Sequence, residues 1–361
     1  MSSPAPDLTC LTHIQTHTRL DCYLKNSSTT ITEYLADISP RGERTAIGPE
    51  DMPRASIIIP TFNRPHLLPR AVESARAAGK DVEIIVVDDA SVDETAAVCS
   101  KFAGIKHIRL ERNQGVAGAR NAGILASRSD YIAFLDDDDL RLPGSIDLQS
   151  DALDANPDVG FVCGVMLMAN QDYSLTGERS APPAGKGDRF WELLQLEFPV
   201  MPLCVLIRKE CFARVGLLNG RLRGIDDWDI LVRIAELYPA MILEDAVGIY
   251  RCPTPRSGQG SSSQASQLTR ALAHQRQLFR LPRVMSATNT QRRSARRKTV
   301  NRVADTLLWN AAGLLRAKAF DSAAANIFTA LRVNPIRALR PGALMKLEQL
   351  LVAVRRESLN Q

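Results

Sequence analysis

The sequence predicts an α/β fold with a Rossmann-like, mostly parallel sheet, helices on both of its faces, and a C-terminal helical appendage. Three observations support this prediction. Short β-branched runs alternate with stretches of helical periodicity from residue 55 onward, and aspartates gather directly after two of the runs. The chain of 361 residues is also longer than a single core usually grows, which favours one large domain and a smaller one.

The alternating elements follow one another closely from residue 56 to residue 155. Strands are expected at 56–60, 82–87, 105–110 and 131–135, and helices at 66–78, 91–102, 115–127 and 143–155. Strand–helix units of this length imply parallel strands that are covered on both faces. Ligands of such sheets bind at the carboxyl ends of the strands, where the aspartates are expected.

Changes in composition divide the chain into four parts. Residues 1–54 are rich in Ser, Thr and Pro and indicate a leader or small cap, whereas residues 55–252 form the α/β domain. Residues 253–267 are rich in Ser, Gly and Pro and indicate a loop or linker. Residues 268–361 are helical and basic, and 311–335 resemble one tetratricopeptide-like helix pair.

Composition and charge exclude several classes of protein. The hydrophobic share of 45% and charged share of 24% are those of a globular protein, and a net charge of +5 is small for a dedicated nucleic-acid binder. No apolar stretch reaches the roughly 20 residues that span a bilayer. The first residues lack the basic and apolar regions of a signal peptide, and the seven cysteines are scattered, so we expect a cytoplasmic protein.

Two local features have more than one interpretation. Cys10, His13, His17 and Cys22 have zinc-compatible side chains, but their spacing is unusual and a loosely ordered leader is the alternative. A basic run from Arg292 to Lys298 is typical of a solvated helix face, and contact with an anionic inner membrane leaflet is the alternative.

Four consecutive aspartates, Asp136–Asp139, follow the apolar strand at 131–135. Packing carboxylates together raises some of their pKa values unless a cation neutralises them. Mg²⁺ and Mn²⁺ prefer carboxylate oxygens and complete their coordination with substrate phosphates and water. The motif therefore predicts a site for Mn²⁺ or Mg²⁺ with a nucleotide diphosphate, and an acidic solvent-exposed turn is the alternative.

Several motifs together resemble the family 2 glycosyltransferases of the GT-A fold, over about residues 55–251. The motifs are ASIIIPTFNRPHLLPRAVES, IIVVDDASVDET, NQGVAGARNAG, YIAFLDDDDLRLP and GLLNGRLRGIDDWDILVR. The resemblance implies transfer of one sugar from a nucleotide-diphosphate donor to a glycan, lipid-linked or other hydroxyl acceptor, with inversion at the anomeric carbon. Neither the membrane helices nor the Gln-x-x-Arg-Trp motif of the processive synthases occurs in the sequence.

Matching positions imply roles on the donor side. Asp136 and Asp138 would meet the metal ion on the diphosphate, with Asp137 beside them in the nucleotide-sugar site. Asp89 would contact the base or ribose, and Arg120 would lie near the nucleotide, where a fixed positive charge suits phosphate. The same nucleotide site would be lined by Pro60, Thr61 and Asn63.

Matching positions also imply roles on the acceptor side. Asp227 would be the general base that removes the proton of the attacking hydroxyl. Asp226 and Trp228 would lie beside the acceptor, although acids also favour a helix N-terminus and a Trp in this position can simply pack. Residues 170–192 and 198–208 are expected to shape the acceptor side.

The sequence also departs from the family and leaves alternatives open. Tyr250 and Arg251 are followed by Cys252 rather than by a nearby His, which puts a further metal ligand in doubt. A noncatalytic nucleotide-sugar-binding scaffold remains an alternative, as does a nucleotidyltransferase, although the latter's Gly-rich basic loop is missing after the first strand. A dinucleotide oxidoreductase is disfavoured because no GxGxxG motif follows that strand.

Overall fold

The computed structural model describes residues 52–180, 182–197, 201–252 and 261–339, all of which belong to one compact unit of the chain, Glu43–Gln361. The predicted leader with Cys10, His13, His17 and Cys22 lies outside the described residues, as does most of the predicted linker. Within the described ranges, no helix has the length and apolar character needed to cross a membrane.

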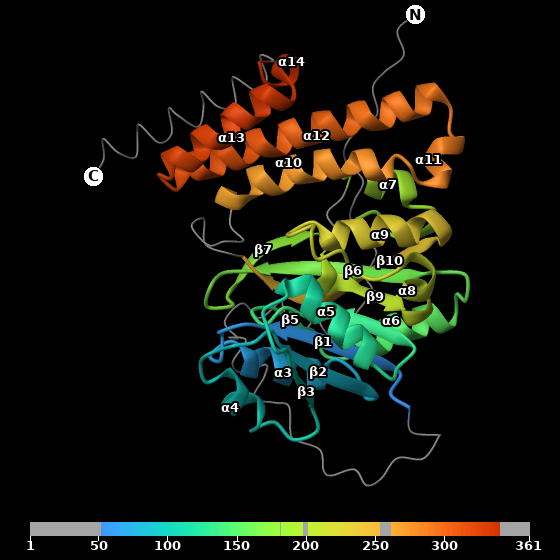
Figure 1. Ribbon diagram of the computed structural model, residues 1–361, viewed down its shortest axis with the longest axis vertical. Coiled ribbons are helices and arrows are strands. Elements are labelled where there is room, and N and C mark those ends of the chain that lie inside the picture. The colour runs from blue at the N-terminus through green and yellow to red at the C-terminus, as the bar shows by residue number, and fades with distance from the viewer. Residues whose placement is uncertain (1–51, 181, 198–200, 253–260, 340–361) are drawn as a thin grey trace, which may run out of the picture. The chain divides into compact units, whose positions relative to one another are not determined.

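A ten-stranded mixed sheet forms the centre of the α/β region (Figure 1). The strand order is β3-β2-β1-β4-β9-β6-β10-β5, with β7 paired to β6 and β8 paired to β10. The first four strands are parallel, whereas β9 runs antiparallel to both β4 and β6. The strands are β1 (Ala55–Thr61), β2 (Val82–Asp88), β3 (Lys106–Arg109), β4 (Tyr131–Phe134), β5 (Leu140–Arg141), β6 (Phe161–Ala169), β7 (Leu175–Ser180), β8 (Gly185–Gly187), β9 (Val205–Arg208) and β10 (Ala240–Arg251).

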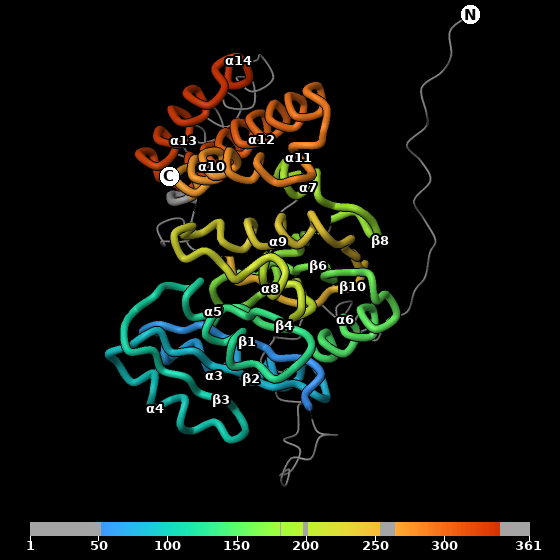
Figure 2. The backbone as a smooth tube through the Cα atoms, turned by 45° about the vertical axis from the view of Figure 1, so that its right-hand side comes forward, coloured from blue at the N-terminus to red at the C-terminus, as the bar shows by residue number. Residues whose placement is uncertain are grey.

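Helices flank this sheet and continue beyond it into the C-terminal region (Figures 1 and 2). Their existence and order confirm the predicted α/β class with a helical appendage. The helices are α3 (Leu68–Ala77), α4 (Thr95–Cys99), α5 (Gly115–Ala126), α6 (Ser145–Asp154), α7 (Phe190–Leu194), α8 (Lys209–Val215), α9 (Asp226–Leu237), α10 (Ser261–Leu278), α11 (Pro282–Ser286), α12 (Asn289–Arg316), α13 (Phe320–Val333) and α14 (Pro335–Ala338).

The order of the first four strands creates a switch point between β1 and β4. The chain moves outward from β1 to β2 and β3, and then returns to place β4 on the other side of β1. Because parallel crossovers are right-handed, this reversal puts α5 on the opposite face of the sheet from α3 and α4. Ligands of α/β sheets bind outside the carboxyl ends of the strands at such a point.

A close approach of α5 to β1 depends on Gly123. A Cβ atom on this glycine would lie only 2.4 Å from Cγ2 of Ile58, which is fully buried in β1. Three residues earlier on the same helix, the Arg120 guanidinium lies over the ring of Phe134 in β4, 5.4 Å from its centroid. The glycine therefore brings the helix, and with it Arg120, close to the switch point.

Some predicted element boundaries were wrong. Of the two segments expected to shape the acceptor side, 170–192 contains β7, β8 and the start of α7, and 198–208 contains the buried core strand β9. The helix expected at 91–102 is only the short α4. Helix α10 begins at Ser261, inside the predicted linker, and the expected helix pair at 311–335 is the end of α12 with α13.

Four cysteines fill positions in the core. Cys99, Cys163, Cys204 and Cys211 are all free and buried. The C-terminal helices have small apolar clusters of their own, centred on Leu307 between α12 and α13. Leu278 of α10 and Val284 of α11 instead belong to the core of the α/β region, so these two helices dock onto it.

Candidate functional site

The predicted donor-side residues follow the carboxyl ends of three adjacent strands. Thr61 ends β1 and is paired in register with Asp88 at the end of β2, directly before Asp89. The four consecutive aspartates follow β4, which pairs with the other side of β1. The topology therefore brings these three segments together at the carboxyl ends of the strands, where the aspartates were expected, and this edge lies at the switch point.

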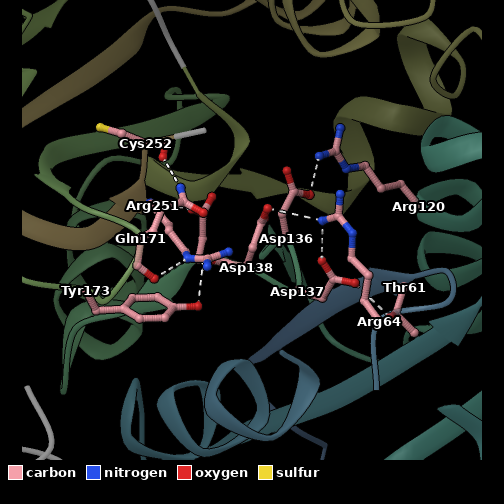
Figure 3. Close-up of polar contacts among 11 residues, drawn as sticks. Thr61, Arg64, Arg120, Asp136, Asp137, Asp138, Gln171, Tyr173, Arg251 and Cys252 are labelled. Carbon is pink, nitrogen blue, oxygen red and sulfur yellow. Dashed lines mark hydrogen bonds and ion pairs between the residues drawn. The ribbon is translucent and has the colours of Figure 1, made fainter. Parts of the chain in front are cut away.

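All four aspartates at this point have protein partners, and Figure 3 shows those of Asp136, Asp137 and Asp138. Asp137 accepts hydrogen bonds from the Thr61 hydroxyl at 2.8 Å and from Arg64 at 3.0 Å, and Arg64 also reaches Asp138 at 3.1 Å. Asp136 accepts from Arg120 at 2.7 Å. The buried Asp139 accepts the backbone N–H of Arg251 at 2.9 Å, which ties the motif to the end of β10.

Arg120 joins two acidic segments that lie far apart in the sequence. Besides Asp136, its guanidinium pairs with Asp226 at 3.4 Å, at the start of α9. Only 4% of the Arg120 side chain is exposed. Burial lowers the pKa of the guanidinium, but the charges of Asp136, Asp226 and Asp227 outweigh that effect and raise it. Arg120 is thus a permanent positive charge between the strand-end aspartates and the first turn of α9.

The first turn of α9 places its acids where the helix dipole favours them. Asp226, Asp227 and Asp229 all lie in this turn, at the positive end of the helix. Burial and the charge of Asp226 raise the pKa of the Asp227 carboxyl to about 6. One oxygen of Asp227 accepts the backbone N–H of Trp228 at 2.8 Å. Asp227 is half-buried, and its pKa is closer to neutrality than that of an ordinary aspartate.

Trp228 packs against protein groups rather than standing free. Its indole N–H donates to the carbonyl oxygen of Leu193 in α7 at 2.8 Å, and its ring meets that of His274 edge to face at 6.3 Å. The side chain is half-buried in this position. These contacts favour the packing interpretation of Trp228 over direct contact with an acceptor.

Asp89 holds the start of α5 with both of its oxygens. They accept the backbone N–H groups of Gln114 at 2.7 Å and of Gly115 at 2.8 Å. Burial raises the pKa of Asp89, and these two hydrogen bonds oppose the rise. A carboxylate oxygen can accept a second hydrogen bond, so this role leaves capacity for a ligand.

Asn63 fastens the loop after β1 to the loop after β2. Its backbone N–H donates to the Ser91 hydroxyl at 2.9 Å, and its side-chain oxygen accepts the N–H of Val92 at 2.9 Å. Asn63 and Ala90 both have positive φ angles, of 53° and 66°, which side-chain-bearing residues rarely adopt. Such local strain is characteristic of functional loops. Pro60, the third predicted residue of this group, is buried in β1 beside Val87.

The aspartates after β4 combine burial with a shortage of positive charge. Burial raises the pKa of Asp137 to about 6, raises that of Asp138, and raises that of Asp139 well above its usual range. The sequence predicted that a metal ion neutralises these aspartates, but Arg64 and Arg120 also supply positive charge to them. The protein therefore neutralises this motif partly by itself.

The donor set fits a hard divalent cation with phosphate ligands. Asp136 and Asp138 retain side-chain exposures of 29% and 16%, while Asp137 and Asp139 are almost completely buried. Across the described parts of the chain, no group of three or more His, Cys, Asp or Glu side chains is placed to hold a metal. Two carboxylates suffice for Mg²⁺ or Mn²⁺ when a diphosphate and water complete the coordination.

Sequence reasoning missed two residues that organise the site, Arg64 and Tyr173. Arg64 bridges Asp137 and Asp138, and Tyr173 donates its hydroxyl to the backbone oxygen of Asp138 at 3.0 Å. The Tyr173 ring lies between the guanidinium groups of Arg70 and Arg251, at 4.9 and 5.3 Å from its centroid. Arg64 follows the first strand in the quoted motif, a signal that could have been used. Tyr173 comes from the turn between β6 and β7, which no local pattern linked to the aspartates.

Comparisons with known proteins show which proteins this chain resembles. Residues 56–215 match the family model for Glycosyl transferase family 2. A Haemophilus influenzae protein described as an uncharacterized glycosyltransferase is 31% identical over 184 residues, which cover 50% of this chain and 62% of that relative. A Campylobacter jejuni GalNAc(5)-diNAcBac-PP-undecaprenol β-1,3-glucosyltransferase is 36% identical over 143 residues, or 38% of this chain and 44% of that relative. The chain thus spans less than two thirds of the length of these curated relatives.

A solved structure supports the fold. The mannosyltransferase PcManGT from Pyrobaculum calidifontis, in complex with GDP-Man and Mn²⁺, is similar with a TM-score of 0.51 and 18% identity, and the match covers 94% of each chain. At this identity the likeness concerns the fold, which is the predicted GT-A type. Residues 56–215, which are 160 of the 361 residues, therefore resemble a glycosyl transferase family 2 domain.

Proposed function

We propose that this protein transfers one sugar from a nucleotide-diphosphate donor to a hydroxyl acceptor, with inversion and with the help of Mn²⁺ or Mg²⁺. The observation that carries the proposal is the bridge made by Arg120, which sets the aspartates after β4 beside the turn that bears Asp227. Donor-side acids and a carboxylate with a pKa of about 6 thereby come together. The match of residues 56–215 to glycosyl transferase family 2 favours glycosyl transfer over nucleotidyl transfer.

On the donor side, Asp136 and Asp138 would hold the cation together with the diphosphate. When bound, such a cation stabilises the negative charge that develops on the departing diphosphate. Asp137, which lies between them in the sequence, is fixed by its bonds to Thr61 and Arg64, and Arg64 also reaches Asp138. Asp89 would accept a hydrogen bond from the base or ribose while it holds the start of α5, and the strained loop at Asn63 would border the same nucleotide.

On the acceptor side, Asp227 would take the proton of the attacking hydroxyl. A general base works best when its pKa lies near the working pH, and burial moves this carboxyl in that direction. A single base supports a one-step displacement, in which the hydroxyl oxygen bonds to the anomeric carbon as the diphosphate leaves and the configuration inverts. Arg120 keeps its positive charge between Asp227's neighbour Asp226 and the donor acids.

Relatives suggest an acceptor class. Two similar proteins are named as glucosyltransferases that act on undecaprenol-diphosphate-linked sugars, and a third as a succinoglycan biosynthesis protein. These names support a lipid-linked or other cell-envelope glycan as the acceptor.

A turnover screen tests the proposed function. Release of nucleoside diphosphate from UDP-, GDP- and dTDP-sugars would be measured with Mn²⁺, with and without undecaprenol-diphosphate-linked acceptors. We expect one nucleotide class to turn over and an added acceptor to accelerate the reaction. Tight donor binding without turnover, under any of these conditions, would instead support the noncatalytic scaffold.

The C-terminal region supports a second proposed interaction, with an anionic membrane surface. Residues 261–361 carry 18 Lys and Arg against 4 Asp and Glu, whereas residues 1–260 carry 27 against 36. On α12, Arg302, Trp309 and Arg316 are spaced seven residues apart and so share one face of the helix, and Trp309 is 77% exposed. Basic residues around an exposed Trp are typical of helices that lie on a membrane surface.

Vesicle sedimentation tests this interaction. We expect the protein to sediment with phosphatidylglycerol vesicles and to be released by high salt, because surface charge attraction is screened. Replacing both Arg302 and Arg316 with Gln should weaken binding roughly thirtyfold, at ~1 kcal/mol per charge. The exposed Arg112 on the α/β region provides the control in Arg112→Gln. Equal sedimentation with neutral phosphatidylcholine vesicles would refute the membrane contact.

A further inference from the structure

From the contacts of α10 we infer that the C-terminal helical region positions the catalytic base, and that His274 is the positioning residue. This inference rests on the proposed role of Asp227 as the base. Neither the sequence motifs nor the family match extends to α10, which lies outside residues 56–215. Helix α10 lies next to α9 in both backbone views (Figures 1 and 2).

His274 is bound to the same helical turn that carries Asp227. Its Nε2 atom lies 2.6 Å from Oδ1 of Asp229, and both side chains are buried. The other Asp229 oxygen accepts from Arg233 one turn later, at 2.7 and 2.9 Å. Arg233 in turn donates to the carbonyl oxygens of Val215 and Leu217. The chain of contacts therefore fixes Asp229 between α10 and the segment that follows α8.

A second contact of α10 is made with the backbone that precedes Asp227 in the sequence. The side chain of Gln267 lies against Gly224. A Cβ atom added to Gly224 would lie only 2.9 Å from Nε2 of Gln267. Gly224 has a φ of +76°, a conformation that suits glycine at the turn into α9. Gln267 and His274 are seven residues apart, and Ala271 and Leu278 on the same face of α10 are buried.

The two contacts bracket Asp226 and Asp227 in the sequence. Gln267 packs against the backbone before them at Gly224, and His274 contacts the carboxylate after them at Asp229. The His274 ring also packs edge to face on Trp228, the residue that directly follows the base. Catalytic geometry is sensitive to small displacements, so loss of this support should reduce turnover more than donor binding.

The neighbouring Gln275 provides a matched control. It donates to the Leu194 carbonyl oxygen at 3.1 Å and to the Thr299 hydroxyl at 2.6 Å, and so joins α10 to α7 and α12. Neither partner belongs to α9. Gln275→Ala therefore removes a buried contact of the same helix without touching the turn that holds Asp227.

Hydrogen–deuterium exchange of the full-length chain tests the structural part directly and needs no substrate. In His274→Ala we expect the backbone amides of residues 224–231 to exchange about tenfold faster, since a buried hydrogen bond to a carboxylate is lost. His274→Gln, which keeps an N–H donor, should restore protection. Gln275→Ala should affect α10 and α12 but not this turn. Unchanged exchange in His274→Ala, or equal acceleration in Gln275→Ala, would overturn the inference.

Kinetics test the functional part. With a donor that the turnover screen has identified, His274→Ala should lower kcat about tenfold and leave the donor KM unchanged, whereas Gln275→Ala should keep both. A fall in stability alone, with kcat per folded molecule unchanged, would contradict a positioning role. If no donor turns over in the wild-type protein, the proposed function fails, but the exchange experiment still decides whether α10 holds the turn.

Discussion

Replacing Asp227 with Asn is expected to lower kcat by about 10²- to 10⁴-fold while leaving donor binding intact. The amide preserves the shape of the side chain but cannot accept the proton of the attacking hydroxyl, and general bases contribute accelerations of this size. Because Asp227 is not among the proposed metal ligands, the affinity for a nucleotide sugar should remain. Steady-state kinetics and calorimetric donor titration measure the two effects separately.

The pH dependence of the activity is a second test of Asp227 as the general base. Asp227 has its pKa raised to about 6 by burial and by the charge of Asp226, so the base is ionised above that pH. Activity should therefore be present above about pH 6 and decline as the pH falls through this value, because the carboxyl becomes protonated. The exposed Asp158, which pairs with Lys186, provides the control in Asp158→Asn. If Asp227→Asn retained more than a tenth of the wild-type kcat, the base would have to lie elsewhere.

Replacing Arg120 with Met should have the largest effect on stability, a loss of about 3–5 kcal/mol in the free energy of unfolding. The variant removes the buried guanidinium and leaves the carboxylates of Asp136 and Asp226 without their positive partner. Urea-induced unfolding, followed by circular dichroism, measures the change. Arg112→Met, at an exposed position on the neighbouring loop, should change stability by less than about 0.5 kcal/mol.

A compensating substitution separates electrostatics from packing in this prediction. Asp226→Asn in the Arg120→Met background removes one of the two orphaned charges and should recover part of the lost stability. A double-mutant cycle then gives the coupling between the two side chains. If Arg120→Met unfolded at the same urea concentration as the wild type, the bridge between the strand-end acids and α9 would not be a stabilising contact.

The part of the fold between residues 55 and 155 could be predicted from the sequence, because the periodicity of each segment and the alternation of the segments indicate the same fold. Alternating β-branched runs and helices between residues 55 and 155 predicted four strands, and all four are present in the parallel part of the sheet. Strand β9 was missed because a central strand only four residues long, entered from a short 3-10 helix, has no periodicity to detect. Strands β7 and β8 are exposed and lie in a Gly- and Pro-containing stretch that is typical of loops.

The candidate site could be predicted only in part, because its acids are visible in the sequence but their partners are distant along the chain. The aspartates stood out because consecutive acids at a strand end are costly without a cation. The partners of these acids are long-range: Arg120 meets Asp226 from 106 positions away, and His274 meets Asp229 from 45 positions away. No spacing rule links such residues. For Asp89, the sequence predicted a place in the site but did not predict the hydrogen bonds to the start of α5.

Metal-dependent donor binding tests the central claim most directly, because it asks whether carboxylates from separate segments hold a nucleotide sugar through a cation. Calorimetric titration of the active nucleotide sugar would be compared in Mn²⁺ and in EDTA. We predict affinity about 100-fold weaker in EDTA, and equally weak in an Asp136→Asn, Asp138→Asn double variant with Mn²⁺, while Asp227→Asn binds like the wild type. Equal affinity with and without Mn²⁺, or undiminished binding by the double variant, would contradict the account.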